Sequence, residues 1–178
     1  MLYAFGFDRI GVLAGDLYFA DPNAVQGQEG PEQGVRLEVR LLQRGELRGS
    51  VYSARPIAVE RPVWRADLLE SVANPGSFDR AHHHPRFRGW EPGPRRFVEE
   101  MSADPVAWVG KRLSELEGVL EEAGVAQDEV GPSDASGVRS AVPEILDAVR
   151  RLLDGVRARE LGLPPEGPTL DRARVGWL

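Results

Sequence analysis

VRLEVRL, residues 35–41, is the stretch of sequence that decides the fold, because its apolar and charged side chains alternate strictly. Successive side chains of a β-strand point to opposite faces, so the valines and leucines share one face. Arg36, Glu38 and Arg40 share the other. The pattern predicts a half-buried strand with its apolar face on a core.

The residues before this strand indicate two shorter strands and a loop. Tyr3, Phe5 and Phe7 alternate with smaller or polar residues, which predicts a strand within residues 2–9. The aromatic run at 17–19 predicts a second strand. Residues 21–34 are polar and rich in Gly, Pro and Gln, so we expect a long exposed loop.

The residues after the first strand extend the predicted sheet. A glycine turn at 43–46 and a new alternation up to residue 53 predict an antiparallel hairpin. Pro56 and Pro62 bracket residues 57–59, which resemble an edge strand because proline cannot donate to the ladder. Residues 63–69 are interpreted as a last strand.

The second half of the chain changes to a helical pattern. Asp104 before Pro105 is a good N-cap, and Gly124 marks a helix end. Two apolar stripes repeat at spacings of three and four, and they predict helices at 104–124 and 140–161. The stripes are Val106, Val109, Leu113, Leu116, Leu120 and Ala123, then Val142, Ile145, Val149, Leu152 and Val156. Residues 125–139 are expected to form a flexible connection.

These elements predict an α+β fold, in which an N-terminal, mostly antiparallel β-sheet packs with a C-terminal two-helix antiparallel hairpin. We expect a single domain over residues 1–178. It divides into a β-rich part (1–69), a structured His/Arg loop (70–103), the helical hairpin (104–161) and an extended tail (162–178). The tail ends in Trp177-Leu178, which either docks on the body or reaches a partner.

Composition excludes several classes of protein. There is no cysteine, which rules out disulfides and thiolate metal sites. No signal peptide or apolar run of membrane-spanning length occurs, so we expect a soluble cytoplasmic protein of bacterial type without a membrane partner. The net charge of −6 argues against a protein that binds duplex DNA through a broadly basic surface.

All three histidines lie in one cluster, within DRAHHHPRFRGWE at residues 79–91. In an extended backbone His82 and His84 would share a side while His83 turns away. His82 and His84 could then act as acid and base with Asp79. Neighbouring cationic and aromatic groups, Arg80, Arg86, Arg88 and Trp90, could bind a phosphate-bearing ligand such as RNA or a nucleotide.

Two other interpretations stay open. His82 and His84 could chelate a divalent metal such as zinc, with Asp67, Asp79 or Glu91 as third ligand; Asp67 is the preferred third ligand. Alternatively, the histidines are solvated or stacked on Phe87 and Trp90. The protein would then be a noncatalytic interaction or assembly module that contacts a protein partner or forms a homodimer.

The order of a strand hairpin, an Asp/Arg and His-x-His segment (Asp79, Arg80, His82, His84), an aromatic stretch and a helix resembles the TumE-like toxin family of bacterial toxin-antitoxin pairs. The likeness covers residues 35–120. It implies an RNA-directed or translation-blocking activity that a partner protein regulates. The leading hypothesis is a protein that binds a phosphate-bearing ligand through the His/Arg loop, and the resemblance implies a toxin-like ribonuclease; an assembly protein and a metal-dependent hydrolase are the alternatives.

Overall fold

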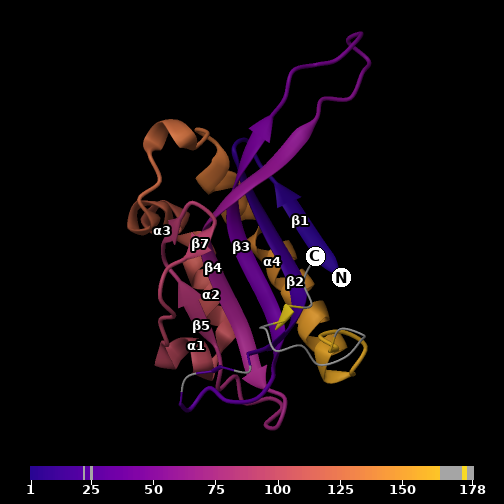
Figure 1. Cartoon of the computed structure of the whole chain (residues 1–178). Helices are drawn as coiled ribbons and strands as arrows, with labels where there is room; N and C mark the ends of the chain where they lie inside the picture. The colour runs from indigo at the N-terminus through magenta and orange to yellow at the C-terminus, as the bar shows by residue number, and fades with distance from the viewer. Residues whose placement is uncertain (22, 25, 165–173, 176–178) are drawn as a thin grey trace.

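Five antiparallel strands form the main sheet, and each pairs with its neighbour in sequence (Figure 1). The computed structural model describes residues 1–21, 23–24, 26–164 and 174–175. The strands are β1 (Leu2–Gly6), β2 (Ile10–Ala20), β3 (Glu32–Arg44), β4 (Ile57–Ser71) and β5 (His82–His84). A short strand, β8 (Arg174–Val175), pairs with the end of β2. A separate small hairpin consists of β6 (Phe87–Arg88) and β7 (Glu91–Pro92).

The helices cover one face of this sheet (Figure 1). They are α1 (Glu99–Ala103), α2 (Pro105–Ser114), α3 (Leu116–Ala123) and α4 (Asp134–Arg157), with a 3-10 turn, η1 (Gln127–Glu129), before α4. No helix within the described ranges is long and apolar enough to cross a membrane. The α+β class predicted from the sequence is confirmed.

The core lies between the sheet and the helices because both present their predicted apolar faces there. Val35, Leu37 and Val39 are fully buried, as are three members of the α4 stripe, while the other two, Val156 and Val142, are 3% and 9% exposed. Trp64 of β4 stacks on Trp108 of α2, with ring centroids 6.0 Å apart. Trp108 is partly buried and packs against the core.

The helix boundaries differ from the prediction in two places. The first helix is interrupted at Glu115, which separates α2 from α3. The second begins at Asp134 rather than near residue 140, and it ends at Arg157. The predicted caps are correct: Asp104 accepts a hydrogen bond from the Ala107 N–H, and Gly124 ends α3 with φ of 74°.

The predicted strands are too short. β2 is continuous from residue 10, and β3 begins at residue 32, inside the segment expected to be a loop. The two strands predicted at 57–59 and 63–69 are one central strand, β4. Pro62 lies opposite Arg40, where the β3–β4 register shifts on both sides, and proline is tolerated within a strand at such an irregularity.

The hairpin turn predicted at 43–46 is also wrong, because β3 and β4 continue outward as a projecting arm, residues 43–58 (Figure 1). Residues 47–53 form no strand, and they carry exposed apolar side chains at the tip of the arm. Val51 is 80% exposed and Tyr52 is 95% exposed.

A buried carboxylate joins the start of the chain to α4. Asp134 is fully buried, and its oxygens accept hydrogen bonds from the backbone N–H groups of Asp8, Arg9, Ile10 and Gly131 at 2.6–3.3 Å. One carboxylate thus accepts from backbone N–H groups of the β1–β2 turn and of the residues just before α4, and it links these two segments. Residues 125–139, expected to be a flexible connection, thus include an anchoring point.

Candidate functional site

The face of the sheet opposite the helices carries a layer of charged side chains. Arg36, Glu38 and Arg40 of β3 lie on this face, but they do not face solvent as a half-buried strand requires. Glu38 is 1% exposed, and the arginine side chains are 12% exposed. The predicted half-buried strand is therefore wrong, because both faces of β3 are covered.

Strand β5 brings two histidines to this layer. In the β4–β5 ladder His82 lies opposite Asp67 and His84 lies opposite Arg65. His83 points to the other face, where its ring contacts Trp64 and Trp108. The predicted alternation of the three side chains is therefore confirmed, and it follows from the extended backbone of a strand.

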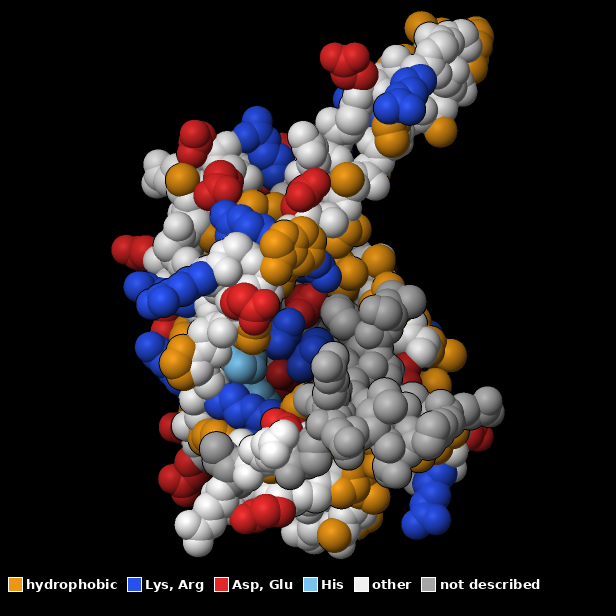
Figure 2. Space-filling view, in the orientation of Figure 1, with side chains coloured by type: hydrophobic (Ala, Val, Ile, Leu, Met, Phe, Trp, Pro, Cys, Tyr) orange, Lys and Arg blue, Asp and Glu red, His pale blue; other side chains and the backbone are white. Residues whose placement is uncertain are grey.

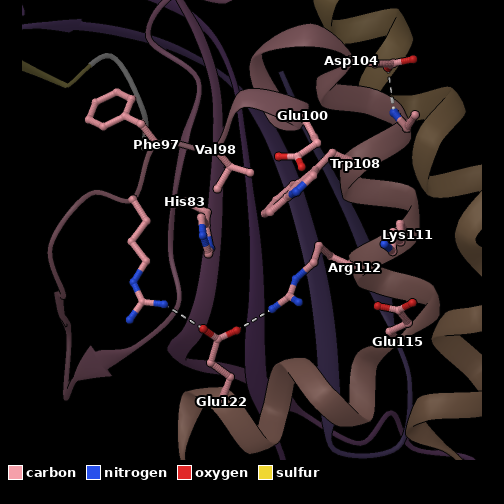
Figure 3. Close-up of a pocket in the computed structure, with 12 residues that line it drawn as sticks. His83, Phe97, Val98, Glu100, Asp104, Trp108, Lys111, Arg112, Glu115 and Glu122 are labelled. Carbon is pink, nitrogen blue, oxygen red and sulfur yellow. Dashed lines mark hydrogen bonds and ion pairs between the residues drawn. The ribbon is translucent and has the colours of Figure 1, made fainter.

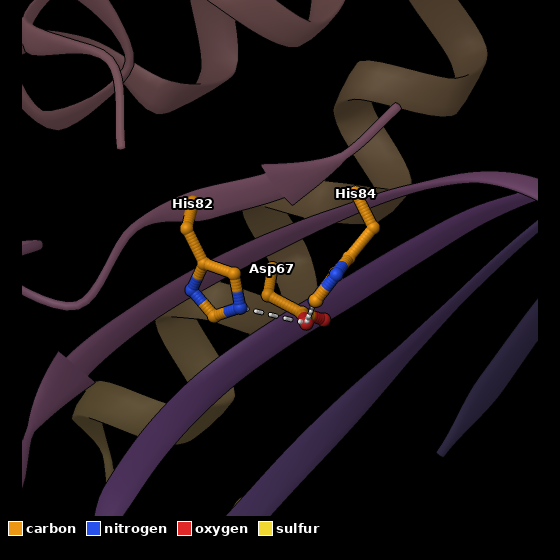
Figure 4. A group of neighbouring side chains, drawn as sticks. All are labelled: Asp67, His82 and His84. Carbon is orange, nitrogen blue, oxygen red and sulfur yellow. Dashed lines mark ion pairs between the residues drawn. The ribbon is translucent and has the colours of Figure 1, made fainter. Parts of the chain in front are cut away.

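Asp67, His82 and His84 form a buried group of three potential metal ligands (Figure 4). The Nε2 atoms of His82 and His84 lie 3.3 Å and 3.6 Å from Asp67 Oδ2. One ligand atom from each residue lies within 4.8 Å of the others, and all three residues are at most 6% exposed. The side chains of His82 and His84 both point at the same carboxylate oxygen.

The outer nitrogen of each imidazole is held by the backbone. His82 Nδ1 lies 2.7 Å from the Arg80 carbonyl oxygen, and His84 Nδ1 lies 2.6 Å from the Gly93 carbonyl oxygen. A carbonyl only accepts, so both Nδ1 atoms must carry the proton. In the neutral rings both Nε2 lone pairs therefore face Asp67 Oδ2, which is itself an acceptor.

Arg36 fixes the carboxylate from the neighbouring strand. Its Nε donates to Asp67 Oδ1 at 2.7 Å and its Nη2 donates to Oδ2 at 3.1 Å. Burial alone would raise the pKa of Asp67, but the nearby Arg36 guanidinium opposes burial, and the pKa lies well below its usual range. Asp67 is therefore an anion at neutral pH.

In the same charged layer, the Glu38 carboxylate accepts hydrogen bonds from two arginines. Arg65 Nε donates to Glu38 Oε1 at 2.8 Å, and Arg40 Nη1 donates to Glu38 Oε2 at 3.0 Å. Burial and the nearby charge of Arg36 lower the pKa of Arg65. Two arginines thus share one buried carboxylate, and one of them, Arg65, lies opposite His84 in the β4–β5 ladder.

The β6–β7 hairpin places aromatic rings over these arginines. The Arg65 guanidinium lies 5.0 Å from the centre of the Phe87 ring, and the Arg40 guanidinium lies 5.3 Å from the Trp90 ring. Trp90 is 60% exposed. It packs on an arginine and not on the histidines, which corrects one of the structural interpretations. Phe87 does approach His84, at 6.4 Å between ring centroids.

Several predicted site residues lie elsewhere. Asp79 accepts hydrogen bonds from Ser71 N and Ser77 Oγ, so it is not part of the acid/base group. Arg80 donates to the Gly27 and Glu29 carbonyls, and Arg86 donates to the Glu122 carbonyl. Arg88 is exposed on β6. The arginines next to the histidines are instead Arg36 and Arg65, which the sequence analysis did not select.

A cleft of about 750 Å³ lies on the other side of β5, between this strand and the helices, and His83 lines it (Figure 3). Glu122 spans the mouth of this cleft by pairing with Arg96 at 3.0 Å and with Arg112 at 2.6 Å. Burial and nearby Arg112 lower the pKa of His83 to about 4, so the ring is neutral at physiological pH. Arg96 and Arg112 thus both pair with Glu122 of α3.

Comparison of the chain with protein-family models, with curated proteins and with solved structures gives no match. The resemblance to TumE-like toxins therefore stays a prediction, and function must be argued from the site alone. The predicted roles of Trp177 and Leu178 lie outside the described residues.

Proposed function

We propose that this protein is a metal-dependent hydrolase that binds a divalent transition metal, such as zinc, through Asp67, His82 and His84. One observation carries the proposal: two imidazole lone pairs and a carboxylate oxygen converge at a buried point. Three acceptors facing one another repel unless a cation lies between them. At metal sites, each ligand side chain is commonly oriented by a second hydrogen bond to a carbonyl or a charged group. Here the Arg80 and Gly93 carbonyls hold the two histidine rings, and Arg36 holds the Asp67 carboxylate.

The alternative source of positive charge is a second proton on each histidine. Charge-assisted N–H···O bonds are about 2.7–2.9 Å long. The observed separations of 3.3 Å and 3.6 Å are longer. Two ligand atoms about 2.1 Å from a tetrahedral zinc ion lie roughly 3.4 Å apart, which agrees with the observed spacing.

Three protein ligands leave a coordination position for water, the arrangement of catalytic rather than structural zinc sites. A bound metal ion lowers the pKa of such a water to about 7 and supplies a nucleophile at neutral pH. The role of the chain is to hold the ligands. Arg36 holds the Asp67 carboxylate, and the Arg80 and Gly93 carbonyls accept from Nδ1, so that the lone pair of each neutral ring lies on Nε2.

Isothermal titration of the chelator-treated protein with zinc tests this proposal. We expect one zinc ion per chain and a rise in melting temperature, because a ligand that binds only the folded state stabilises it. Cobalt substitution should give the visible absorption of a low-coordinate N/O site. A heat signal no larger than that of zinc added to buffer would contradict the proposal.

A second candidate function, self-assembly, rests on the projecting arm. Exposed apolar side chains gather at its tip, where Val51 and Tyr52 are almost fully exposed (Figure 2). The arm carries Arg44, Arg48 and Arg55 against Glu46, a balance of +2, while the whole chain carries −6, so the remaining residues carry −8. The arm is therefore opposite in net charge to the rest of a second copy of the chain.

Replacing both Val51 and Tyr52 with serine should convert a dimer to a monomer, because their apolar area would be lost from the interface. Light scattering coupled to size exclusion measures the mass. The melting temperature should not change, since both side chains are exposed. Val72→Ser, at a partly exposed apolar residue outside the arm, is the control. A wild-type protein that is monomeric at high concentration excludes this function.

A further inference from the structure

We infer that the cleft on the helix side of β5 binds a small carboxylic acid with an aromatic body, its carboxylate on Arg112 and Lys111 and its ring on Trp108. The cleft is lined by β5, by the segment that leads into α1, and by α2 and α3 (Figure 3). It lies on the opposite face of β5 from the proposed metal ligands, so the inference goes beyond the metal site and does not depend on it.

The size and the apolar lining of the cleft suit a small organic molecule. Its volume is about 750 Å³. Small-molecule sites usually measure roughly 300–1,000 Å³. Trp108 and Phe97 contribute aromatic side chains to the lining, and Val98 adds an aliphatic one. Phe97 is 49% exposed, so apolar area remains for a ligand to cover.

Arg112 holds a buried hydrogen-bond donor that has no acceptor among the described residues. Its Nη2 donates to Glu122 Oε2 at 2.6 Å, but its Nε is buried and makes no hydrogen bond. A guanidinium only donates, so this N–H lacks an oxygen acceptor. The Trp108 ring does not replace the acceptor, because the guanidinium carbon lies 5.9 Å from the ring centre, at the limit of a cation–π contact. An acceptor supplied by a ligand is therefore favoured here.

His83 is a second buried polar group at this cleft without a partner. The residue is 5% exposed, and its Nδ1 makes no hydrogen bond to any residue that the structure describes. Contacts with the rings of Trp64 and Trp108 hold the imidazole in place, at 6.3 Å and 5.0 Å between centroids. Figure 3 shows His83, Trp108 and Arg112 pointing toward the same space. Buried polar groups normally have partners, so two without them around one cleft indicate a site for a polar ligand group.

The charges of the cleft favour a carboxylate as this polar group. Arg96 and Arg112 share Glu122, so one positive charge of the three groups is not neutralised. Lys111 also lines the cleft and forms no ion pair within the described ranges. Three further acids line the cleft, and all are exposed: Glu100, Asp104 and Glu115. Water and salt screen exposed charges, so these acids oppose a carboxylate less than the buried donor attracts it.

Calorimetric titration of the chelator-treated protein tests the inference, because no metal ion is then present to bind the carboxylate. The probes are phenylacetate, phenylacetamide, which lacks the charge, and acetate, which lacks the ring. We expect one phenylacetate per chain and affinities about tenfold lower or less for the other two. Equal affinity for phenylacetamide, or phenylacetate heats no larger than those of dilution, would overturn the inference.

Lys111 provides a reporter inside the cleft, because it is the only lysine in the sequence. Reductive methylation with isotopically labelled formaldehyde keeps the charge and labels only Lys111 and the N-terminal amine. Phenylacetate should shift the Lys111 methyl resonance in the NMR spectrum. The N-terminal resonance should stay unchanged, since that amine pairs with Asp16 away from the cleft. A shift of the N-terminal signal alone overturns the assignment of the site.

Two substitutions test the unpartnered nitrogens. Arg112→Lys keeps the charge beside Glu122 but removes the Nε donor, so it should weaken phenylacetate binding about tenfold. His83→Phe keeps a ring against Trp108 and removes both nitrogens, and we expect a loss of similar size. Arg139→Lys is the matched control, because Arg139 pairs with Glu117 on the surface. Circular dichroism and melting curves show which variants are folded. Folded Arg112→Lys and His83→Phe proteins that bind as tightly as the wild type contradict the inference.

Two sources supply an aromatic carboxylate: a free aromatic acid, and an aromatic amino acid, which adds an ammonium group. Titration with phenylalanine separates them, because Glu100 and Glu115 at the rim attract an ammonium group. Tighter binding of phenylalanine than of phenylacetate identifies an amino acid as the ligand. Weaker binding identifies a free acid.

Discussion

His82→Ala should lower the affinity for zinc by at least about 100-fold, because it removes one of three ligands and not merely an outer partner. His84→Ala should have an effect of the same size. Both rings point at Asp67 Oδ2 and are almost completely buried, so no nearby histidine can replace them. The measurement is zinc titration of the purified variants, followed by elemental analysis.

His83→Ala is the matched control for these variants. It removes an imidazole from the same strand, but that ring faces Trp64 and Trp108 on the opposite face. We expect it to lower the melting temperature while zinc still binds at one ion per chain. If His83→Ala abolished zinc binding as completely as His82→Ala, the ligand set proposed here would be wrong.

Asp134→Ala should destabilise the protein by about 3–5 kcal/mol. The change leaves buried backbone N–H groups without an acceptor, and each unsatisfied donor costs about 1–3 kcal/mol. Those donors belong to residues 8–10 and to Gly131. Urea denaturation gives the free energy of unfolding. Asp134→Asn should lose less, since its amide oxygen still accepts.

The control for this prediction lies on the same helix. Asp147 is 61% exposed and pairs with Arg150 in a surface ion pair, so Asp147→Ala should change the stability little. Equal stability of Asp134→Ala and Asp147→Ala would show that the buried carboxylate does not hold the start of the chain to α4.

The sequence predicted the fold class because both periodicities are strong. The valines and leucines of β3 and the stripe of α4 face the core as expected. The ends of the strands were missed because local signals conflict with tertiary pairing. Pro62 indicates a strand end, but a local shift of register lets β4 continue past it.

The charged face of β3 was misread for a similar reason. Alternation shows that Arg36 and Glu38 share a face, but it does not show what covers that face. The partners that bury them lie on other strands and on the β6–β7 hairpin, and so depend on register. One feature of the sequence did indicate ion pairing on this face: the charges at residues 36, 38 and 40 alternate in sign.

The candidate site was predicted in part. The extended backbone at residues 82–84 was enough to place His82 and His84 on one side. Asp79 was chosen as a catalytic partner because it is close in sequence, but the ladder brings Asp67 opposite His82 instead. Proximity in sequence is a poor guide where a turn separates two strands, since pairing selects the neighbours.

The order of the strands in the sheet has a consequence for how the chain folds. Each strand from β1 to β5 pairs with the one made just before it, so the sheet can grow in step with synthesis on the ribosome. Of β1 to β5, β5 is made last, and it carries His82 and His84. If the proposed metal site is correct, a nascent chain therefore cannot bring its three ligands together until β5 has been made and has paired with β4.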